Sequence, residues 1–180
     1  MAHLTSSIEY ALHCLLWLAV AEGSPLSSRD LAELQGISPA FVAKIFPKLE
    51  KAGIVAASSG LRGGYLLAQP PERITVLAVV DAIEGDKPLF DCQEIRERCA
   101  LFSADPPRWA TQGVCAVHAV MMKAEKAMRD SLASETLADV ARTFGRKAPA
   151  SFDGDVQAWL QARHQGRGAR RASRTREGPG

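Results

Sequence analysis

The sequence predicts a mainly α-helical protein with a small β-hairpin wing: a winged helix-turn-helix followed by a long C-terminal dimerisation helix. Three observations predict this fold class. Two short helical patterns are joined by about four residues, a glycine-rich hairpin follows the second, and a long helical pattern lies towards the C-terminus. We expect a winged-helix domain over residues 1–84, a cysteine-bearing loop over 85–114, the dimerisation helix over 115–145, and a short helix with a basic tail over 146–180.

The first two helices follow from their apolar spacing and their end signals. Over residues 5–22, apolar side chains recur at helical spacing until Gly23 ends the pattern. Ser27 begins the second helix, and Asp30 follows three residues later, which is a capping-box-like start. Gly36 ends this helix, so two helices precede the predicted turn.

The third helix is predicted to be the recognition helix of a helix-turn-helix. Ser38 and Pro39 begin it, because serine is a favoured N-cap and proline fits the first helical position. Gly53 ends it. Pro47 lies inside it and is expected to kink or shorten the helix, because proline lacks a backbone N–H group.

A β-hairpin is predicted directly after the third helix. Two β-like runs, residues 54–56 and 65–68, flank a loop over 58–64 that contains three glycines and Arg62. A hairpin in this position is typical of a wing, which can set Arg62 against the phosphate backbone or in the minor groove. A phosphate-binding loop is disfavoured, because no helix with Lys-Ser/Thr follows at the required spacing.

The C-terminal half combines two further helices with a long irregular segment. A fourth helix is predicted over 75–84, and residues 86–114 lack a regular pattern, which is long for a loop in a compact domain. One long helix is predicted from about 115 to 143, with a stripe of Val, Met and Ala that forms a dimer seam or packs on its own domain. Residues 152–163 predict a short amphipathic helix before a low-complexity basic end.

The net charge of +2 averages segments of opposite sign. Residues 38–64 sum to +3 and residues 161–180 to +5, whereas residues 76–160 sum to −3. The average therefore does not exclude nucleic-acid binding. The longest apolar run, residues 11–21, is too short to span a bilayer, and no signal-peptide pattern is present. We expect a cytoplasmic protein without a membrane partner, whose four cysteines stay reduced.

Three segments together resemble the Rrf2 family of bacterial winged-helix regulators, over about residues 3–145: the wing GLRGGYLLAQPPERITVLAVVDAIEG, the opening IEYALHCLLWLA, and the cysteine loop that ends in CAVHAV. The family includes iron–sulfur-cluster and nitric-oxide-sensing repressors. The resemblance implies a homodimeric transcription regulator, expected to be a repressor, that binds a double-stranded DNA operator. It also implies that the presence or redox state of an iron–sulfur cluster controls the operator affinity.

The resemblance further implies that residues 85–114 are a cluster-binding loop. The candidate thiolate ligands are Cys92, Cys99 and Cys115. Three thiolates leave a four-ligand cluster short of one group. Glu9 and His13 lie at i and i+4 on one helix face, and in some family members the N-terminal helix of the partner subunit completes the coordination. Their motif resembles that of members with a [2Fe–2S] cluster held by Cys, Glu and His.

Other ligand sets stay open. His118, one helical turn after Cys115, is the alternative fourth ligand. The three thiols with His118 could instead bind zinc in a regulator without a cluster, or the thiols could sense by themselves. The gap of fifteen residues between Cys99 and Cys115 is wider than in most family members, so one thiol can be a bystander. Cys14, on the apolar face of the first helix, is predicted to be a core residue.

The predicted DNA contacts come from the helix-turn-helix and the wing: Ser28, Ser38, Ala40, Phe41, Lys44, Lys48, Ser59 and Arg62. Lys44 and Lys48 lie one turn apart on the outward face and are expected to bind phosphates. Ser38 and Ala40 lie at the helix start, where base edges are reached. The chain has no CxxC motif and no recognisable substrate-binding fold, so we expect neither an enzyme nor a small-molecule substrate.

Overall fold

The computed structural model of the chain describes residues 4–21, 23–60, 63–85, 87–102 and 105–163. It is mainly helical with one two-stranded antiparallel hairpin, as the sequence predicts. The elements in chain order are α1 (Ser6–Val20), α2 (Ser28–Gln35), α3 (Pro39–Lys51), β1 (Val55–Ser58), β2 (Gly64–Leu67), α4 (Val76–Glu84), α5 (Arg108–Thr111), α6 (Ala116–Ser134) and α7 (Leu137–Gly145). Short 3-10 turns lie at Pro71–Arg73, Ile95–Arg98 and Ala100–Phe102, and the predicted helix at 152–163 follows α7.

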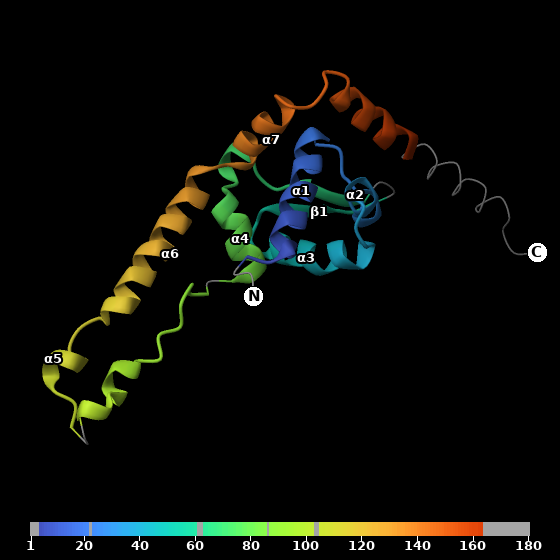
Figure 1. Cartoon of the computed structure of the whole chain (residues 1–180). Coiled ribbons are helices and arrows are strands. Elements are labelled where there is room, and N and C mark those ends of the chain that lie inside the picture. Colours follow the sequence, from blue (N-terminus) through green and yellow to red (C-terminus); the bar gives the residue numbers. More distant parts are fainter. Residues whose placement is uncertain (1–3, 22, 61–62, 86, 103–104, 164–180) are drawn as a thin grey trace, which may run out of the picture.

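Helix α1 lies at the centre of the winged-helix domain, where α2, α3, α4, α7 and the hairpin surround it (Figure 1). Its inward face is apolar, and Ala11, Cys14 and Leu15 are fully buried there. Phe46 of α3 packs on Tyr65 of β2, with ring centroids 4.6 Å apart. This core fixes the positions of α3 and the hairpin relative to α1.

The predicted start signals of α2 and α3 are confirmed. Ser27 and Asp30 form a reciprocal capping box at α2, and Gly36 ends that helix in the left-handed region, with φ of 67°. Ser38 caps α3, and Pro39 is its first residue. The local sequence therefore determines where the turn of the helix-turn-helix begins and ends.

The sequence suggested that Pro47 would either kink or shorten the third helix. The structure shows that Pro47 does not shorten α3. The helix is continuous from Pro39 to Lys51. Pro47 lies on the exposed side, whereas Phe46 and Leu49 on either side of it are fully buried. Core packing thus compensates for the backbone hydrogen bond that proline cannot donate.

The wing depends on a close backbone approach at Gly64. In the hairpin Gly64 lies opposite Ser58. On the other edge of β2, the N–H group of Leu26 donates to the Tyr65 carbonyl (3.1 Å), and the Leu26 carbonyl accepts from the Tyr65 N–H group (2.8 Å). A Cβ atom at Gly64 would lie 2.4 Å from the Leu26 carbonyl oxygen. Only glycine allows this third strand segment to pair with the wing.

Replacing Gly64 by Ala is expected to lower the free energy of unfolding by about 1–3 kcal/mol, because the added methyl group must push the backbone at Leu26 away. Chemical denaturation followed by circular dichroism measures this change. Gly154→Ala is the matched control: its Cβ atom would meet nothing within 4 Å, and helical alanine should cost no stability. Equal stability of Gly64→Ala and the wild type would contradict the role given to this contact.

The single long helix predicted over about 115–143 is divided in the structure, into α6 and α7. At the break, the N–H group of Val76 donates to the Glu135 carbonyl and that of Leu137 donates to the Ile74 carbonyl, both at 2.8 Å. These bonds pair the break with the segment that precedes α4. The helical pattern continues through Glu135, but a tertiary backbone pairing interrupts the helix there.

A second capping box restarts the helix after the break. The Thr136 hydroxyl accepts from the Asp139 N–H group, and the Asp139 carboxylate accepts from the Thr136 backbone. The hydrogen bond from the Thr136 side chain is the main cause that holds the pKa of the Asp139 carboxyl below its usual value. This Thr-x-x-Asp signal is present in the sequence, where it marks the start of a new helix.

Helix α6 projects from the winged-helix domain as an arm, with α5 near its far end (Figure 1). Arg129 attaches this arm to α4 through a two-pronged ion pair with Asp81, with N–O distances of 3.0 and 2.9 Å. Within the described part of the chain, no residue of α6 is buried, and Val117 and Val120 are 58% and 62% exposed. No helix among the described residues is both long and apolar enough to cross a membrane.

Candidate DNA interface and metal-ligating residues

The start of α3 and the end of β1 present four of the predicted DNA contacts to solvent. Ser38, Ala40 and Lys44 are exposed on α3 and its cap, and Ser59 is exposed where the chain enters the wing loop. The Ser38 hydroxyl accepts a hydrogen bond from the Ala40 N–H group (3.3 Å), so it is held at the N-terminus of the helix. A helix N-terminus carries partial positive charge, which favours contact with phosphate.

Two other predicted contacts, Phe41 and Lys48, interact with neighbouring helices of the domain. The ring of Phe41 packs edge-on against Tyr10 of α1, with centroids 5.0 Å apart. The Lys48 ammonium donates to the Ile83 carbonyl at 2.6 Å, near the C-terminal end of α4. These interactions support structural roles for Phe41 and Lys48, whereas no hydrogen bond or ion pair joins Lys44 to a described residue. Ser28 is half-buried at the start of α2. Arg62 lies outside the described residues.

Cys14 is a core residue, as predicted. Its side chain is fully buried in α1, and burial raises the pKa of its thiol to about 12. The thiol therefore stays neutral across the physiological pH range and is a poor metal ligand or nucleophile. No disulfide joins the cysteines, all of which lie among the described residues.

Three side chains near the N-terminal end of α6, the end next to α5, form a candidate metal-ligating group. We call it the donor group: Cys92, Glu94 and His118. Their ligand atoms all lie within 4.8 Å of one another. In the described ranges, no other set of three or more His, Cys, Asp or Glu side chains meets this distance. Thiolate, carboxylate and imidazole are all ligands of zinc and iron. The structure thus joins the predicted ligand Cys92 with the alternative ligand His118.

Glu94 is a member of the donor group that sequence reasoning missed. It has a positive φ of 46°, which among the described residues only glycines share. Its carboxylate accepts from the Cys92 thiol (Sγ–Oε1 distance 3.7 Å) and from Arg96 (Nε–Oε2 distance 2.8 Å). Arg96 also donates to the Gly113 carbonyl at 2.7 Å, so it connects the Glu94 region to the segment that precedes α6. The only available signal was a carboxylate two residues after a cysteine.

The other two predicted thiolates lie outside the donor group. Cys99 is exposed between two 3-10 turns, and Cys115 is half-buried at the N-cap of α6. One helical turn separates Cys115 from His118, as predicted. Phe90 packs near the His118 ring, with centroids 6.0 Å apart, and covers one side of the donor group.

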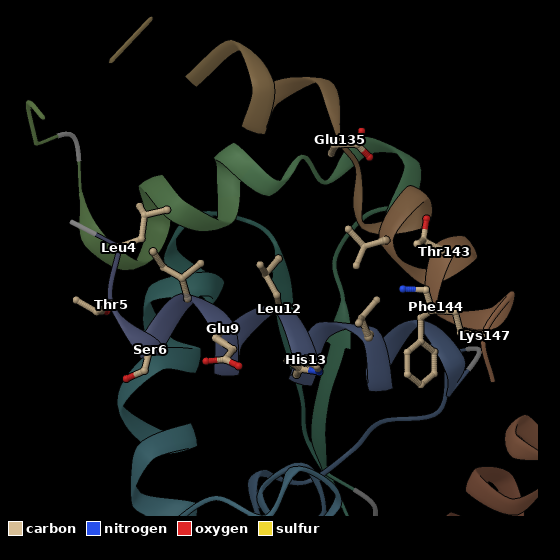
Figure 2. Close-up of a pocket in the computed structure, with 13 residues that line it drawn as sticks. Leu4, Thr5, Ser6, Glu9, Leu12, His13, Glu135, Thr143, Phe144 and Lys147 are labelled. Atoms are coloured by element: carbon tan, nitrogen blue, oxygen red, sulfur yellow. The ribbon is translucent and has the colours of Figure 1, made fainter. Parts of the chain in front are cut away.

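Glu9 and His13 lie together on a different surface. Both line a cavity of about 810 Å³ between α1 and α7, which Phe144 and Lys147 also border (Figure 2). Glu9 is exposed and His13 is half-buried, and neither side chain forms a hydrogen bond or ion pair with a described residue. The predicted pair on one helix face is therefore present, but it lies apart from the donor group of the same chain.

The chain matches known regulators over most of its length. The family model for Rrf2, described as an iron-dependent transcriptional regulator, matches residues 4–143. Protein rrf2 of Nitratidesulfovibrio vulgaris is 36% identical over 140 residues, which is 77% of this chain and 87% of that protein. The transcriptional regulator IscR of Aliivibrio salmonicida is 40% identical over 90 residues, which is 49% of this chain and 54% of IscR. The likeness to IscR therefore spans about half of that protein.

Solved structures show the same fold. The structure of T. potens IscR superposes with a TM-score of 0.61 at 25% identity, covering 84% of this chain and 95% of that one. CymR, the global cysteine regulator of B. subtilis, superposes with a TM-score of 0.63 at 23% identity, covering 79% of this chain and 98% of CymR. At this identity, the likeness to CymR shows the fold alone.

Proposed function

The chain belongs to the Rrf2 family of transcriptional regulators, and we propose that it is a homodimeric, cytoplasmic repressor whose operator affinity depends on an iron–sulfur cluster in its cysteine loop. One observation carries this proposal: the donor group includes His118 at the N-terminal, far end of α6, and the same helix is bonded to the winged-helix domain through Arg129. A ligand bound there can therefore influence the position of the DNA-binding elements.

DNA binding is assigned to the start of α3 and to the wing. Ser38 and Ala40 are proposed to contact base edges and Lys44 to bind a phosphate, which their exposure at the start of α3 supports. Ser59 and Arg62 of the wing are proposed as backbone or minor-groove contacts. Two copies of this surface in a symmetric dimer would bind a two-fold-symmetric operator.

The arm is assigned to dimerisation. An exposed apolar stripe on a helix that buries none of its described residues is a surface that a partner normally covers. The face with Val117 and Val120 points away from the face that carries Arg129 towards α4, because helical positions advance by about 100° per residue. A second copy can therefore cover the stripe without displacing α4.

The three thiols of the loop are the ligand type that an iron–sulfur cluster needs, and one of them, Cys92, lies in the donor group. Cys92, Cys99 and Cys115 would supply thiolates, and none of them forms a disulfide. His118 already lies beside Cys92, and we propose that Glu9 and His13, which lie outside the donor group, act from a partner subunit. When bound, a [2Fe–2S] cluster would supply a charge that changes with redox state. The likeness to IscR supports this cofactor.

Two polar contacts provide a route from the donor group to the recognition helix. Arg129 of α6 holds Asp81 of α4, and Lys48 of α3 holds the Ile83 carbonyl of the same α4. A shift of the arm would therefore be passed through α4 to α3 by ionic and hydrogen bonds. We propose this connection as the means by which the cysteine loop changes operator affinity.

A regulator that binds zinc is the second candidate, and the composition of the donor group favours it. Cysteine, carboxylate and histidine together suit a single zinc ion, and only one of the thiols is in the group. In such a regulator the metal would order the loop and the thiols would not hold a cluster.

Anaerobic purification of the full chain separates these candidates. The cluster predicts visible absorbance with iron and acid-labile sulfide in equal amounts, whereas a colourless protein with stoichiometric zinc would support the second candidate. DNA binding is tested separately, by fluorescence anisotropy on duplexes that the protein selects from a random pool. Replacing Lys44 by Ala should weaken binding and reduce the salt dependence by about one phosphate contact per site.

Lys48→Ala is the matched control for Lys44→Ala, because the Lys48 ammonium is engaged with α4. It should alter the salt dependence less than Lys44→Ala does. If the two variants reduce the salt dependence equally, the assignment of α3 surfaces is wrong. If the wild-type protein selects no duplex, the proposed function is wrong as a whole.

A further inference from the structure

The helix at 152–163 is docked on the winged-helix domain, and we call it the anchor helix. Its inward residues Val156 and Leu160 are 5% and 3% exposed and belong to the main core. The Gln157 side chain donates to the Val20 carbonyl at the end of α1 (2.7 Å). The helix is thus held by both apolar burial and a directional hydrogen bond.

An aromatic cluster fixes the start of the anchor helix. Phe152 packs against Trp17 of α1 and Phe144 of α7, with ring centroids 6.1 and 5.5 Å away. The Trp17 indole N–H group donates to the Gln35 side chain of α2 at 3.0 Å. The cluster therefore joins the anchor helix to the same α1 and α2 that support the helix-turn-helix.

The end of the anchor helix lies on α2. The Arg163 guanidinium stacks over the Trp159 ring, 4.6 Å from its centroid, and forms an ion pair with Glu33 of α2. In Figure 1 the C-terminal end of this helix lies on the side of the molecule that carries α2 and the hairpin. The last described residue, Arg163, therefore lies beside the first helix of the helix-turn-helix.

The residues that follow the anchor helix, 164–180, have a composition that suits a polyanion. They contain five arginines and one glutamate, and their apolar residues are two alanines and a proline. A segment without large apolar side chains cannot fill an apolar groove or insert into a membrane. Arginine, in contrast, binds phosphate through paired hydrogen bonds as well as charge.

We propose that the anchor helix delivers this Arg-rich segment to DNA, where its arginines bind backbone phosphates next to the site read by α3 and the wing. This inference rests on the proposed DNA-binding function. Seventeen residues can reach at most roughly 55–60 Å, which exceeds one turn of duplex DNA, so several phosphates are within range. Tethering beside α2 keeps the arginines at high effective concentration near the bound duplex.

The test compares the wild type with a variant in which every arginine of the segment is neutral: Arg167→Gln, Arg170→Gln, Arg171→Gln, Arg174→Gln and Arg176→Gln. The dissociation constant for a selected 30-base-pair duplex and for one of random sequence is measured as a function of salt. We expect the slope of log Kd against log salt to fall by roughly 2–4 for each protomer, since each phosphate contact contributes about 0.9. Both duplexes should be affected alike, because phosphates carry no sequence information.

Two further variants sharpen the test. A chain with residues 164–180 in permuted order keeps the charge and should bind as the wild type does. Leu160→Ser with Arg163→Ala keeps all five arginines of the segment but loosens the anchor, and should give an intermediate slope. Thermal unfolding monitors whether the core of each variant remains intact.

The possible results are distinct. If the variant with all five arginines replaced by glutamine has the same salt slope as a wild type that binds DNA normally, the inference is overturned and the proposed function still stands. A wild-type slope for the loosened anchor would overturn the role of the anchor helix. Absence of DNA binding by the wild type itself would remove the proposed function and this inference together.

Discussion

Replacing Val117 and Val120 by Asp is expected to convert the proposed dimer to monomers and to lower operator affinity by about 100-fold or more. The reason is that separate monomers would bind the two half-sites independently, without the gain in affinity that comes from linking them. Both side chains are largely exposed on the arm, so carboxylates there cost the monomer little. In a dimer the same carboxylates would be buried opposite their own copies, without a counter-charge. Light scattering coupled to size-exclusion chromatography measures the mass, and fluorescence anisotropy measures the affinity.

Met122→Asp is the matched control for this change. Met122 is 50% exposed on the same helix, but two residues beyond Val120 it points to the opposite side. The control should remain a dimer. A double valine variant that keeps the mass and affinity of the wild type would show that the stripe on α6 is not the seam.

Replacing Cys92 by Ser together with His118 by Ala is expected to abolish metal or cluster binding in the cysteine loop. The change removes two of the three members of the donor group, including its only thiolate. Arg96→Gln should weaken binding by about 10- to 100-fold without removing a ligand, because Arg96 orients the Glu94 carboxylate. Metal content after anaerobic purification, and a competition titration with a chelator, measure the two effects.

Cys14→Ala provides the control, since burial keeps the Cys14 thiol neutral and Cys14 does not belong to the donor group. It should retain the full metal content even if the core loses some stability. Separately, Glu9→Ala with His13→Ala tests whether a partner subunit completes the coordination. Full metal content in the Cys92/His118 variant would refute the donor group as the site.

The helix-turn-helix and the wing could be predicted from sequence because their signals are local. A serine cap, a proline at the first helical position and a glycine at a helix end act within a few residues of chain. The split of the long helix was predictable only in part. The Thr136 capping box is visible in the sequence, but the backbone pairing of Glu135 with the segment before α4 is not.

For the candidate site, too, the sequence could predict some features and only the fold could supply the others. The thiols, Glu9, His13 and His118 could be named from the sequence because few side chains bind metals. The grouping of Cys92 with Glu94 and His118 needed the fold, since a residue 26 positions later in the chain closes the group. Lys48 shows the converse: its spacing suggests a phosphate ligand, whereas its ammonium bonds to α4.

The sequence by itself determined the class of the protein: helices with defined ends, a wing, a supply of thiols and a strongly basic C-terminal segment. Local hydrogen-bonding and steric preferences suffice for these features. Only the tertiary structure decided which donors converge, that Lys48 bonds to α4, and that the helix before the basic segment ends beside α2. These outcomes depend on contacts between residues far apart in the chain, and periodicity and capping carry no information about such contacts.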